Sequence, residues 1–433
     1  AANAGLLASF GAAGLMPDQI EAAILELKDS LQQKPFCFNL IYSPNEKGHE
    51  EAVVDLYLKY GIDRVETSAY MALTLPVVRY RVAGIHKDDA GNIITPNRII
   101  AKASRTEVAT QWFSPPPDKF LTELVKRGEI STAQAELASC IPMAQDLTLE
   151  ADSGGHTDNR PAITLIPAII ALRDRLQTQY KYRVPLRVGA AGGIATPASA
   201  AAAFAMGAAY IVTGTINQAC VESGSSDTAR RMLAEAGQAD VAMAPAVDMF
   251  EMGVKLQVLK RGTMFAMRGN KLYELYRSYP SLEAIPAAER ETLEKGIFKA
   301  SLDNIWEETR RFFLERDPAE IKKAEQDQKH KMALVFRWYL GLSSRWANAG
   351  NPDRQVDYQI WCGPAMGAFN EWAKGSSLEQ PENRKVVNIA HNLMYGAALV
   401  ARLNQLRMQG IHIPSSAMQI GPLESSAIER YLN

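Results

Sequence analysis

The stretch Val188-Gly189-Ala190-Ala191-Gly192-Gly193-Ile194-Ala195-Thr196-Pro197 leads through an alanine-rich segment into Tyr210-Ile211-Val212-Thr213-Gly214-Thr215. Two short apolar runs that each end in glycine, with a helical segment between them, are typical of a β-α-β unit in a parallel sheet. In a (β/α)₈ barrel the loops after the last two strands commonly bind phosphate, because glycine backbone lets N–H groups point at the anion. A phosphate group is therefore predicted to bind at Gly192, Gly193, Gly214 and Thr215. The alternative is that these glycines only close tight turns. The spacing does not fit the G-x-G-x-x-G fingerprint of a dinucleotide fold.

Similar β-α units fill the chain from its start to about residue 220. Strands are predicted at residues 6–10, 36–41, 64–68, 98–103, 147–152, 186–190 and 210–213. These are one short of the eight strands of a TIM barrel. Because the chain begins at Ala1 without an initiating Met, we expect the remaining strand to precede it. The predicted fold class is α/β, a TIM barrel whose first strand is missing from this chain, and an open seven-stranded sheet is the alternative.

One connection in this half, residues 104–146, is too long for a simple crossover. It contains Pro115-Pro116-Pro117 and two helical patterns at 118–127 and 131–138, so a helical insertion is predicted at about 105–146. Beyond about residue 248 no strand pattern is visible, and amphipathic helices are predicted at 293–315, 318–340 and 384–409. The predicted domains are a barrel over residues 1–247 and a mainly helical substrate or lid domain over 248–433.

The composition excludes several classes of protein. Lys and Arg number 47 against 48 Asp and Glu, so the chain has no basic field that would hold nucleic acid. The four cysteines, Cys37, Cys140, Cys220 and Cys362, form no C-x-x-C pair, which argues against a zinc site or a disulfide framework. We interpret them as the reduced thiols of a cytoplasmic protein. No apolar run reaches the roughly 18 residues that a membrane span requires.

The segment LEADSGGHTD, residues 149–158, is a second candidate for chemistry. Its predicted strand runs into Gly154-Gly155, where the backbone could approach a flat ligand closely, and then into His156. Barrel enzymes carry their catalytic groups at this C-terminal rim, and histidine can donate a proton near neutral pH. His156 is therefore the predicted catalytic residue, with a structural role as the alternative. No metal is predicted, because one histidine with Asp152 and Asp158 is weak evidence for a metal site.

Two polar residues lie in other predicted strands, namely Asn39 and Lys102. A lysine inside an otherwise apolar strand needs an anionic partner or a route to solvent, because a bare buried ammonium group is costly. An anionic ligand would provide that partner. The alternative is an ion pair with a carboxylate of the barrel, such as Glu66 or Glu150.

The order of the segments ANAGLL, FNL, EADSGGH, GAAGGI and TGT resembles the nitronate monooxygenase and FabK-type enoyl reductase superfamily of FMN barrels. Within that superfamily the chain looks like the PfaD family, the enoyl reductases of polyunsaturated fatty acid synthases and of trans-acyltransferase polyketide synthases. The resemblance covers essentially the whole chain, and it is carried by EADSGGHTDNRP (150–161), DMFEMGVKLQVLKRGTM (248–264), residues 272–280 and DYQIWCGPAMGAFN (357–370). Asp152 stands where the superfamily usually has Glu.

The resemblance implies an FMN- and NADPH-dependent enoyl-[acyl-carrier-protein] reductase. The FMN phosphate would lie on Gly192, Gly193, Gly214 and Thr215, and the isoalloxazine near Asn39, Lys102 and Gly155. His156 matches the histidine of the superfamily's Gly-Gly-His. Hydride would pass from NADPH through the flavin to the β-carbon of the enoyl thioester.

Three kinds of partner are implied as well: an acyl carrier protein that delivers the thioester, other synthase subunits, and a second copy of the chain in a homodimer. A basic surface for an acidic carrier could be formed by Lys255, Lys260, Arg261, Arg268 and Lys271, although such a run is also typical of a solvated helix face. Two other functions remain open. One is a nitronate monooxygenase, against which the long helical half argues, and the other is a non-catalytic scaffold subunit of a synthase.

Overall fold

The computed structural model describes residues 1–42 and 48–432, which form two compact units. The first unit comprises Ala1–Ala151, Asn159–Val212 and Val387–Met418. The second comprises Asp152–Asp158, Thr213–Val386 and Gln419–Asn433. The chain thus crosses between the units several times, and a division at residue 247 stays a prediction about domain organisation.

The first unit is built on a parallel sheet whose seven strands follow one another in sequence order. These strands are β1 (Ser9–Phe10), β2 (Cys37–Ile41), β3 (Arg64–Ser68), β6 (Arg98–Ala103), β7 (Asp146–Glu150), β9 (Arg187–Ala191) and β10 (Tyr210–Val212). They confirm all seven strands predicted from the sequence. Within the described residues, β1 and β10 are the two edge strands. Strands that are neighbours both in sequence and in space are the arrangement of a (β/α) barrel.

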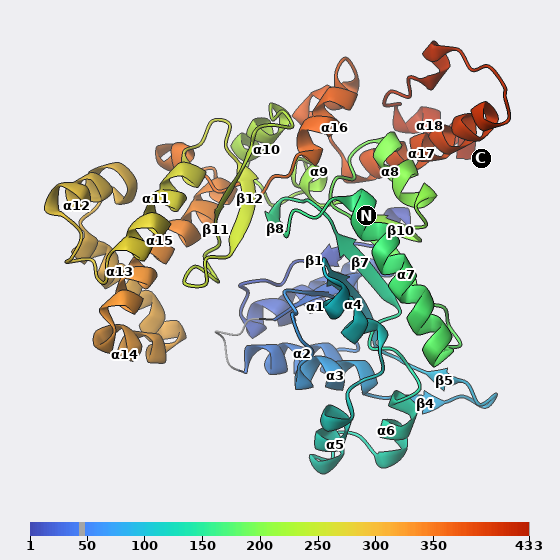
Figure 1. The fold of residues 1–433 in the computed structure, drawn as a ribbon, viewed down its shortest axis with the longest axis horizontal. Coiled ribbons are helices and arrows are strands. Elements are labelled where there is room, and N and C mark those ends of the chain that lie inside the picture. The colour runs from blue at the N-terminus through green and yellow to red at the C-terminus, as the bar shows by residue number, and fades with distance from the viewer. Residues whose placement is uncertain (43–47, 433) are drawn as a thin grey trace. The chain divides into compact units, whose positions relative to one another are not determined.

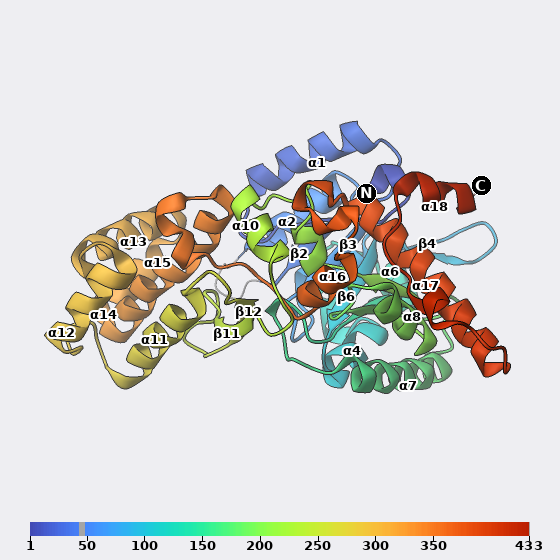
Figure 2. The ribbon, with the colours of Figure 1, turned by 90° about the horizontal axis from the view of Figure 1, so that it is seen from above.

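The two faces of this sheet differ in character. In β6 the side chains of Ile99, Ala101 and Ala103 are buried, whereas those of Ile100 and Lys102 on the opposite face are partly exposed. The buried face forms an apolar core with the surrounding helices, among which α4 and α7 lie side by side (Figures 1 and 2). The helices are α1 (Pro17–Leu31), α2 (His49–Lys59), α3 (Leu75–Val82), α4 (Thr106–Phe113), α7 (Ala162–Tyr180), α8 (Pro197–Ala205) and α17 (Val386–Met408). The opposite face is the polar one, and the predicted site residues of β2 and β6 lie on it.

The predicted helical insertion is confirmed by α5 (Asp118–Lys126) and α6 (Thr132–Ala138), which lie between β6 and β7 in the chain. Ser131 caps the start of α6, at the residue where the second helical pattern was predicted to begin. Its hydroxyl accepts a hydrogen bond from the backbone N–H of Gln134, and its own backbone N–H donates to the Gln134 side chain. A small hairpin, β4 (His86–Lys87) with β5 (Ile93–Ile94), precedes β6.

The second unit contains an antiparallel sheet in the order β11-β12-β8. Its strands are β8 (Gly155–His156), β11 (Val241–Pro245) and β12 (Lys255–Leu259). The expectation that no strand follows residue 248 was therefore wrong. The sequence Lys255-Leu256-Gln257-Val258 alternates polar and apolar residues, so it carried a short strand signal that was missed, and Gln257 is buried in the structure together with its apolar neighbours.

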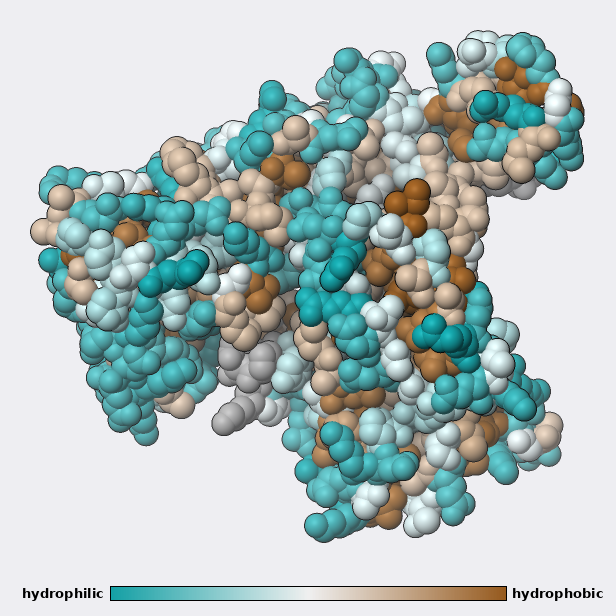
Figure 3. All heavy atoms as spheres, in the orientation of Figure 1, coloured by the Kyte–Doolittle hydropathy of each residue, from teal (hydrophilic) through white to brown (hydrophobic). Residues whose placement is uncertain are grey.

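The rest of the second unit is helical, as expected. Its α-helices are α9 (Thr215–Gln218), α10 (Asp227–Ala234), α11 (Phe265–Ser278), α12 (Ala287–Leu293), α13 (Leu302–Arg316), α14 (Pro318–Gln326), α15 (Gln328–Ala349), α16 (Ala365–Ala373) and α18 (Ser425–Leu432). Helices α13 and α14 pack against α15 (Figures 1 and 2). A second apolar core is formed by side chains of β11, β12, α11, α12, α13 and α15. The surface over α12 to α14 is mostly hydrophilic (Figure 3).

Two helices predicted as continuous are interrupted. The segment 293–315 is divided by a π-helical turn, Glu294–Phe298, after which Ser301 caps α13 by accepting a hydrogen bond from the Asn304 N–H. The segment 318–340 is divided at Asp327, whose carboxylate accepts hydrogen bonds from two backbone N–H groups at the start of α15. Such side chains favour a new helix start over continuation, and their capping role overrides the apolar periodicity.

All four cysteines are free thiols, and only Cys140 is exposed. In the part of the chain that the structure describes, no helix is both long enough and apolar enough to cross a membrane.

Candidate active site

Lys102 lies on the polar face of the seven-stranded sheet, between two carboxylates. Its Nζ is 3.2 Å from Oε1 of Glu66 on β3 and 3.7 Å from Oε1 of Glu150 on β7. Parallel pairing with the strands on either side of β6 brings these groups together. The side chains of Lys102 and Glu66 are only 21% and 14% exposed. The ion pair considered as an alternative from the sequence is therefore present, and it involves both of the candidate carboxylates.

This environment changes the acidity of Lys102. Burial acts to lower the pKa of Lys102, but the negative charges of Glu150 and Glu66 outweigh burial, so the pKa is raised above its ordinary value. The ammonium group is thus held charged on a surface where an anionic ligand could also be bound.

The raised pKa of Lys102 predicts a loss of stability in alkaline solution. The ion pairs contribute fully to the free energy of unfolding below the ordinary pKa of lysine, and this contribution is lost as the pH rises through the raised pKa of the folded state. Urea unfolding measured from neutral to alkaline pH should show this decline. In a Glu66→Gln/Glu150→Gln variant, the part of the alkaline decline that comes from the ion pairs of Lys102 should be absent. Equal declines in the two proteins would contradict the prediction.

Asn39 is fixed next to this cluster. Its side-chain amide nitrogen donates to the backbone carbonyl of Glu66 at 3.0 Å and to Oγ of Ser68 at 2.9 Å. The Tyr57 hydroxyl donates to the backbone carbonyl of Asn39 at 2.7 Å. Asn39 and Lys102 therefore lie on one face of the same sheet, on either side of β3.

A further residue on this face, Tyr210 of β10, was not singled out from the sequence. Its ring covers Gly189 so closely that a Cβ at that position would overlap it, and its hydroxyl lies 3.0 Å from Oγ1 of Thr148. Gly189 thus makes room for the Tyr210 ring, whereas the glycines that follow β9 have a different environment.

The predicted phosphate segments have open backbone. Gly192 and Gly193 directly follow β9 with φ values of +84° and +74°, a conformation that favours glycine. A Cβ at Gly193 or at Gly214 would meet no atom within 4 Å. Gly192 and Gly193 belong to the first unit. Gly214 and Thr215 belong to the second unit, which resumes at Thr213 directly after β10. Exposed glycine backbone of this kind fits an anion such as the FMN phosphate.

His156 lies in β8, where it pairs with Leu256 of β12. Its Nε2 is 3.1 Å from Oδ1 of Asp248, and its ring meets the Trp361 ring edge-on at a centroid distance of 5.7 Å. The imidazole is 35% exposed, so it is held from two sides and still reaches solvent. Burial acts to raise the pKa of Asp248, but the hydrogen bond with His156 prevails and the pKa is lowered. Asp248 thus stays ionised, and it can orient the imidazole.

The two glycines before His156 make room for another part of the second unit. A Cβ at Gly154 would lie 2.8 Å from the backbone nitrogen of Cys362, and one at Gly155 would lie 2.6 Å from the Trp361 ring. Gly155 also has a φ of +81°. Packing against Trp361–Gly363 thus accounts for both glycines. The proximity of a flat ligand to Gly155 stays a prediction.

Gly154→Ala is expected to lower the free energy of unfolding by about 1–3 kcal/mol, because the methyl group would overlap backbone atoms that cannot turn aside. The matched control is Gly214→Ala, whose Cβ enters open space at a φ of −125°, with an expected change below about 0.5 kcal/mol. Urea unfolding of both variants checks this, and equal losses would contradict it.

Two of the basic residues proposed to contact a carrier protein form ion pairs within the second unit. Arg268 forms an ion pair with the fully buried Asp357, to which Arg354 and the Tyr339 hydroxyl also bind. Lys271 pairs with Glu289 at 3.0 Å. Arg268 therefore serves the interior of the second unit.

Sequence reasoning assigned no role to Asp248 or Trp361, although both lie inside segments used for the family resemblance. Only the folded β8–β12 pairing and the packing on Gly154 bring residues 248 and 361 to His156. A sequence alone gives no indication of such contacts across about 90 and 200 residues.

Comparison with known proteins agrees with this architecture. The nitronate monooxygenase family model matches residues 1–272, and the model of the inserted helical domain of [acyl-carrier-protein] S-malonyltransferase matches residues 279–358. One polyunsaturated fatty acid synthase protein of Thraustochytrium sp. is 50% identical over 409 residues, which are 93% of this chain and 27% of that protein. The polyketide biosynthesis protein PksE of Bacillus subtilis is 45% identical over 414 residues, 95% of this chain and 53% of that protein. The chain therefore spans about half or less of the length of these relatives.

Among solved structures, the enoyl reductase domain of MlnA from the macrolactin biosynthesis cluster of Bacillus amyloliquefaciens superposes with a TM-score of 0.89 at 39% identity. The match covers 94% of this chain and 91% of that domain. It confirms the barrel-type α/β fold and the helical C-terminal region predicted from the sequence. It also confirms the resemblance to the PfaD family. The chain belongs to the nitronate monooxygenase family, in the branch that contains the MlnA enoyl reductase domain and the matching parts of polyunsaturated fatty acid synthases.

Proposed function

We propose that this chain is an FMN-dependent enoyl reductase, which uses NADPH to reduce the α,β double bond of enoyl thioesters in polyunsaturated fatty acid or polyketide biosynthesis. The observation that carries the proposal is the match over nearly the full length of both chains with the MlnA enoyl reductase domain. The family's members are flavin-dependent oxidoreductases, and the open glycine backbone and the charged Lys102 suit a phosphorylated, electron-rich cofactor.

In this proposal FMN, when bound, supplies hydride transfer to the β-carbon of the thioester. Gly192, Gly193, Gly214 and Thr215 bind its phosphate, and Asn39, Lys102 and Gly155 lie near its ring system. Lys102 provides a fixed positive charge where negative charge develops. Since Glu66 and Glu150 already orient the ammonium group, little reorganisation would be needed when an anion binds.

His156 is the proposed catalytic residue. Reduction of an enoyl thioester builds negative charge on the thioester oxygen and requires a proton at the α-carbon. When both ring nitrogens carry a proton, Nε2–H faces Asp248, and Nδ1–H can donate a hydrogen bond to the oxygen or a proton to the α-carbon. Asp248 at 3.1 Å favours an imidazole that carries a proton on the nitrogen facing it, and Trp361 limits the rotation of the ring.

The partners follow from the same proposal. The substrate is carried by an acyl carrier protein, the chain acts beside other synthase subunits, and it forms a homodimer. The names of the relatives as fatty acid synthase and polyketide biosynthesis proteins support the first two of these expectations.

An absorbance experiment tests the function. The purified chain should contain a flavin whose absorbance is bleached by NADPH without oxygen and recovers when a crotonyl thioester is added. Bleaching without recovery would contradict the reductase. A nitronate monooxygenase, which the family match to residues 1–272 makes the second candidate, would instead be bleached by a nitronate and not by NADPH. A colourless protein would support a scaffold subunit.

A further inference from the structure

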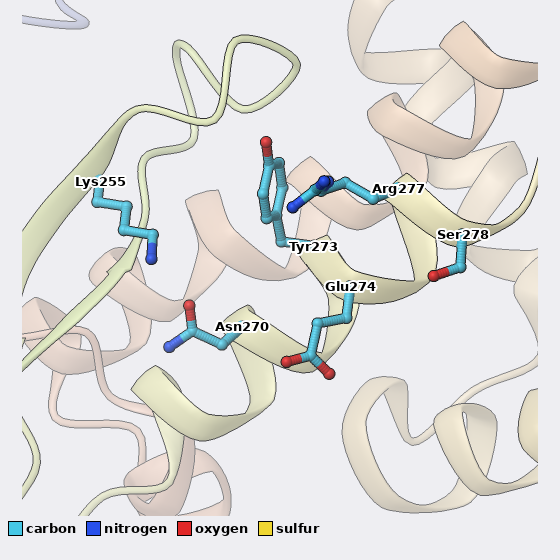
Figure 4. A pocket seen from close by; sticks show the side chains of 6 residues that line it. All are labelled: Lys255, Asn270, Tyr273, Glu274, Arg277 and Ser278. Carbon is cyan, nitrogen blue, oxygen red and sulfur yellow. The ribbon is translucent and has the colours of Figure 1, made fainter.

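A pocket of about 580 Å³ lies in the second unit between α11 and the start of β12 (Figure 4). It is lined by Lys255, Asn270, Tyr273, Glu274, Arg277 and Ser278. Five of these residues come from α11 at spacings of three and four, so they occupy one face of that helix, and Lys255 is the first residue of β12. Proteins commonly bind small organic ligands in pockets of about 300–1,000 Å³.

Two cations of this pocket have no partner in the protein. Within residues 1–42 and 48–432, the side chains of Lys255 and Arg277 form neither a hydrogen bond nor an ion pair, and both residues are exposed. Other cations of α11 are compensated, since Lys271 pairs with Glu289 and Arg268 with Asp357. The pocket thus contains two unpaired cations against one carboxylate, that of Glu274, and its net positive charge favours an anion.

The geometry of the two cations suits one bound group. In Figure 4 the Arg277 side chain points back along α11 toward Tyr273, and the Lys255 side chain points from β12 toward Asn270. The Tyr273 ring packs edge-on against the buried Phe250, at a centroid distance of 5.4 Å, so this wall of the pocket is held in place. A planar guanidinium with a flexible ammonium group is the combination that binds phosphate oxygens well.

Acceptors in the same pocket restrict the kind of anion. The Asn270 amide nitrogen donates to the backbone carbonyl of Met243 at 2.8 Å, which leaves the amide oxygen as the group it can offer to a ligand. Glu274 contributes an exposed carboxylate. A free phosphate ion would be repelled by this carboxylate and would fill a small part of the volume. A larger ligand could bind the two cations through its phosphate and donate hydrogen bonds to the acceptors, Asn270 and Glu274, through its other groups.

We propose that this pocket binds an organic phosphate, whose phosphate group lies between Lys255 and Arg277 and whose N–H or O–H groups face Glu274 and Asn270. The inference adds a binding site to the proposed function and does not depend on the reaction catalysed. Two sources share this chemistry, namely a nucleotide phosphate and the phosphopantetheine arm of a carrier protein.

Calorimetric titration of the purified chain tests the proposal with 4′-phosphopantetheine and 2′,5′-ADP, each compared with its dephosphorylated form, pantetheine or adenosine. At least one phosphate ester should bind, and its dephosphorylated form should bind at least about tenfold more weakly. The ester that binds identifies the source. Lys255→Gln and Arg277→Gln should each raise the Kd about tenfold or more, since each removes a charge-assisted hydrogen bond.

The matched control is Lys271→Gln, which removes the same charge from the same helix at a residue already paired with Glu289, and it should leave the Kd unchanged. Glu274→Gln should tighten the binding of inorganic phosphate, because it removes the repulsion. Binding of neither ester, or unchanged binding in both Lys255→Gln and Arg277→Gln, would overturn the proposal. Phosphate binding is measured without any turnover, so its failure is distinguishable from a failure of the reductase proposal.

Discussion

His156→Gln is expected to lower the turnover of an enoyl thioester by about 10²–10⁴-fold, the usual contribution of a positioned general acid. Glutamine is close to histidine in size and can still donate a hydrogen bond, but it cannot release a proton. The variant should keep its flavin and its stability, because the imidazole is 35% exposed and its neighbours Asp248 and Trp361 remain. Steady-state rates with NADPH and a crotonyl thioester measure the effect, and the flavin absorbance confirms that the cofactor is retained.

A companion variant, Asp248→Asn, separates catalysis from positioning. It keeps the shape of the partner but removes the charge that orients the imidazole, so a smaller loss of about 10–100-fold is expected. If His156→Gln turned over at the rate of the unchanged protein, the proton donor would be water or another acid, and His156 would serve only the packing of β8 against Trp361.

The seven-stranded sheet could be predicted well because its strands carry their own signal. Residues 64–68 and 98–103 were predicted as strands with the bounds of β3 and β6, since they are short apolar, β-branched runs between helical patterns, and their side chains alternate in burial in the structure. Some of these strands are followed by a helix with a recognisable start, such as Thr74 before α3 and the Thr196-Pro197 that begins α8. Local propensity and the tertiary fold agree throughout this unit, so local reasoning was sufficient.

The second unit was harder to predict for the opposite reason. β8 is only two residues long, and it exists because β12 pairs with it, about 100 residues later in the chain. Gly154 and Gly155 suggested a surface for a ligand, yet their neighbours are Trp361 and Cys362. A glycine shows that something approaches closely, but the sequence does not say what that is. Lys102 is a contrasting case, because Glu66 and Glu150 were named from the sequence as candidate partners and the structure places both beside its ammonium group.

Lys102→Met is expected to lower the free energy of unfolding by about 2–3 kcal/mol and to abolish flavin binding. Methionine has a similar length but no charge, so Glu66, only 14% exposed, and Glu150 would face each other without a cation. Removal of one partner from a buried ion pair is strongly destabilising, and the loss is moderated here because Glu150 is 39% exposed. Urea unfolding gives the stability, and the ratio of flavin to protein absorbance gives the cofactor content.

The triple variant Lys102→Met/Glu66→Gln/Glu150→Gln decides between the two explanations of Lys102. Neutral amides no longer require a cation, so the stability should return to within about 1 kcal/mol of the unchanged protein. If Lys102 contacts the cofactor, as proposed, the triple variant stays colourless although it is folded. If the flavin returns together with the stability, the lysine serves only its ion pairs with Glu66 and Glu150, and its assignment to the cofactor site is wrong. The control Glu66→Gln/Glu150→Gln retains Lys102 and should keep the flavin, since it removes acceptors of the ammonium group without removing the positive charge.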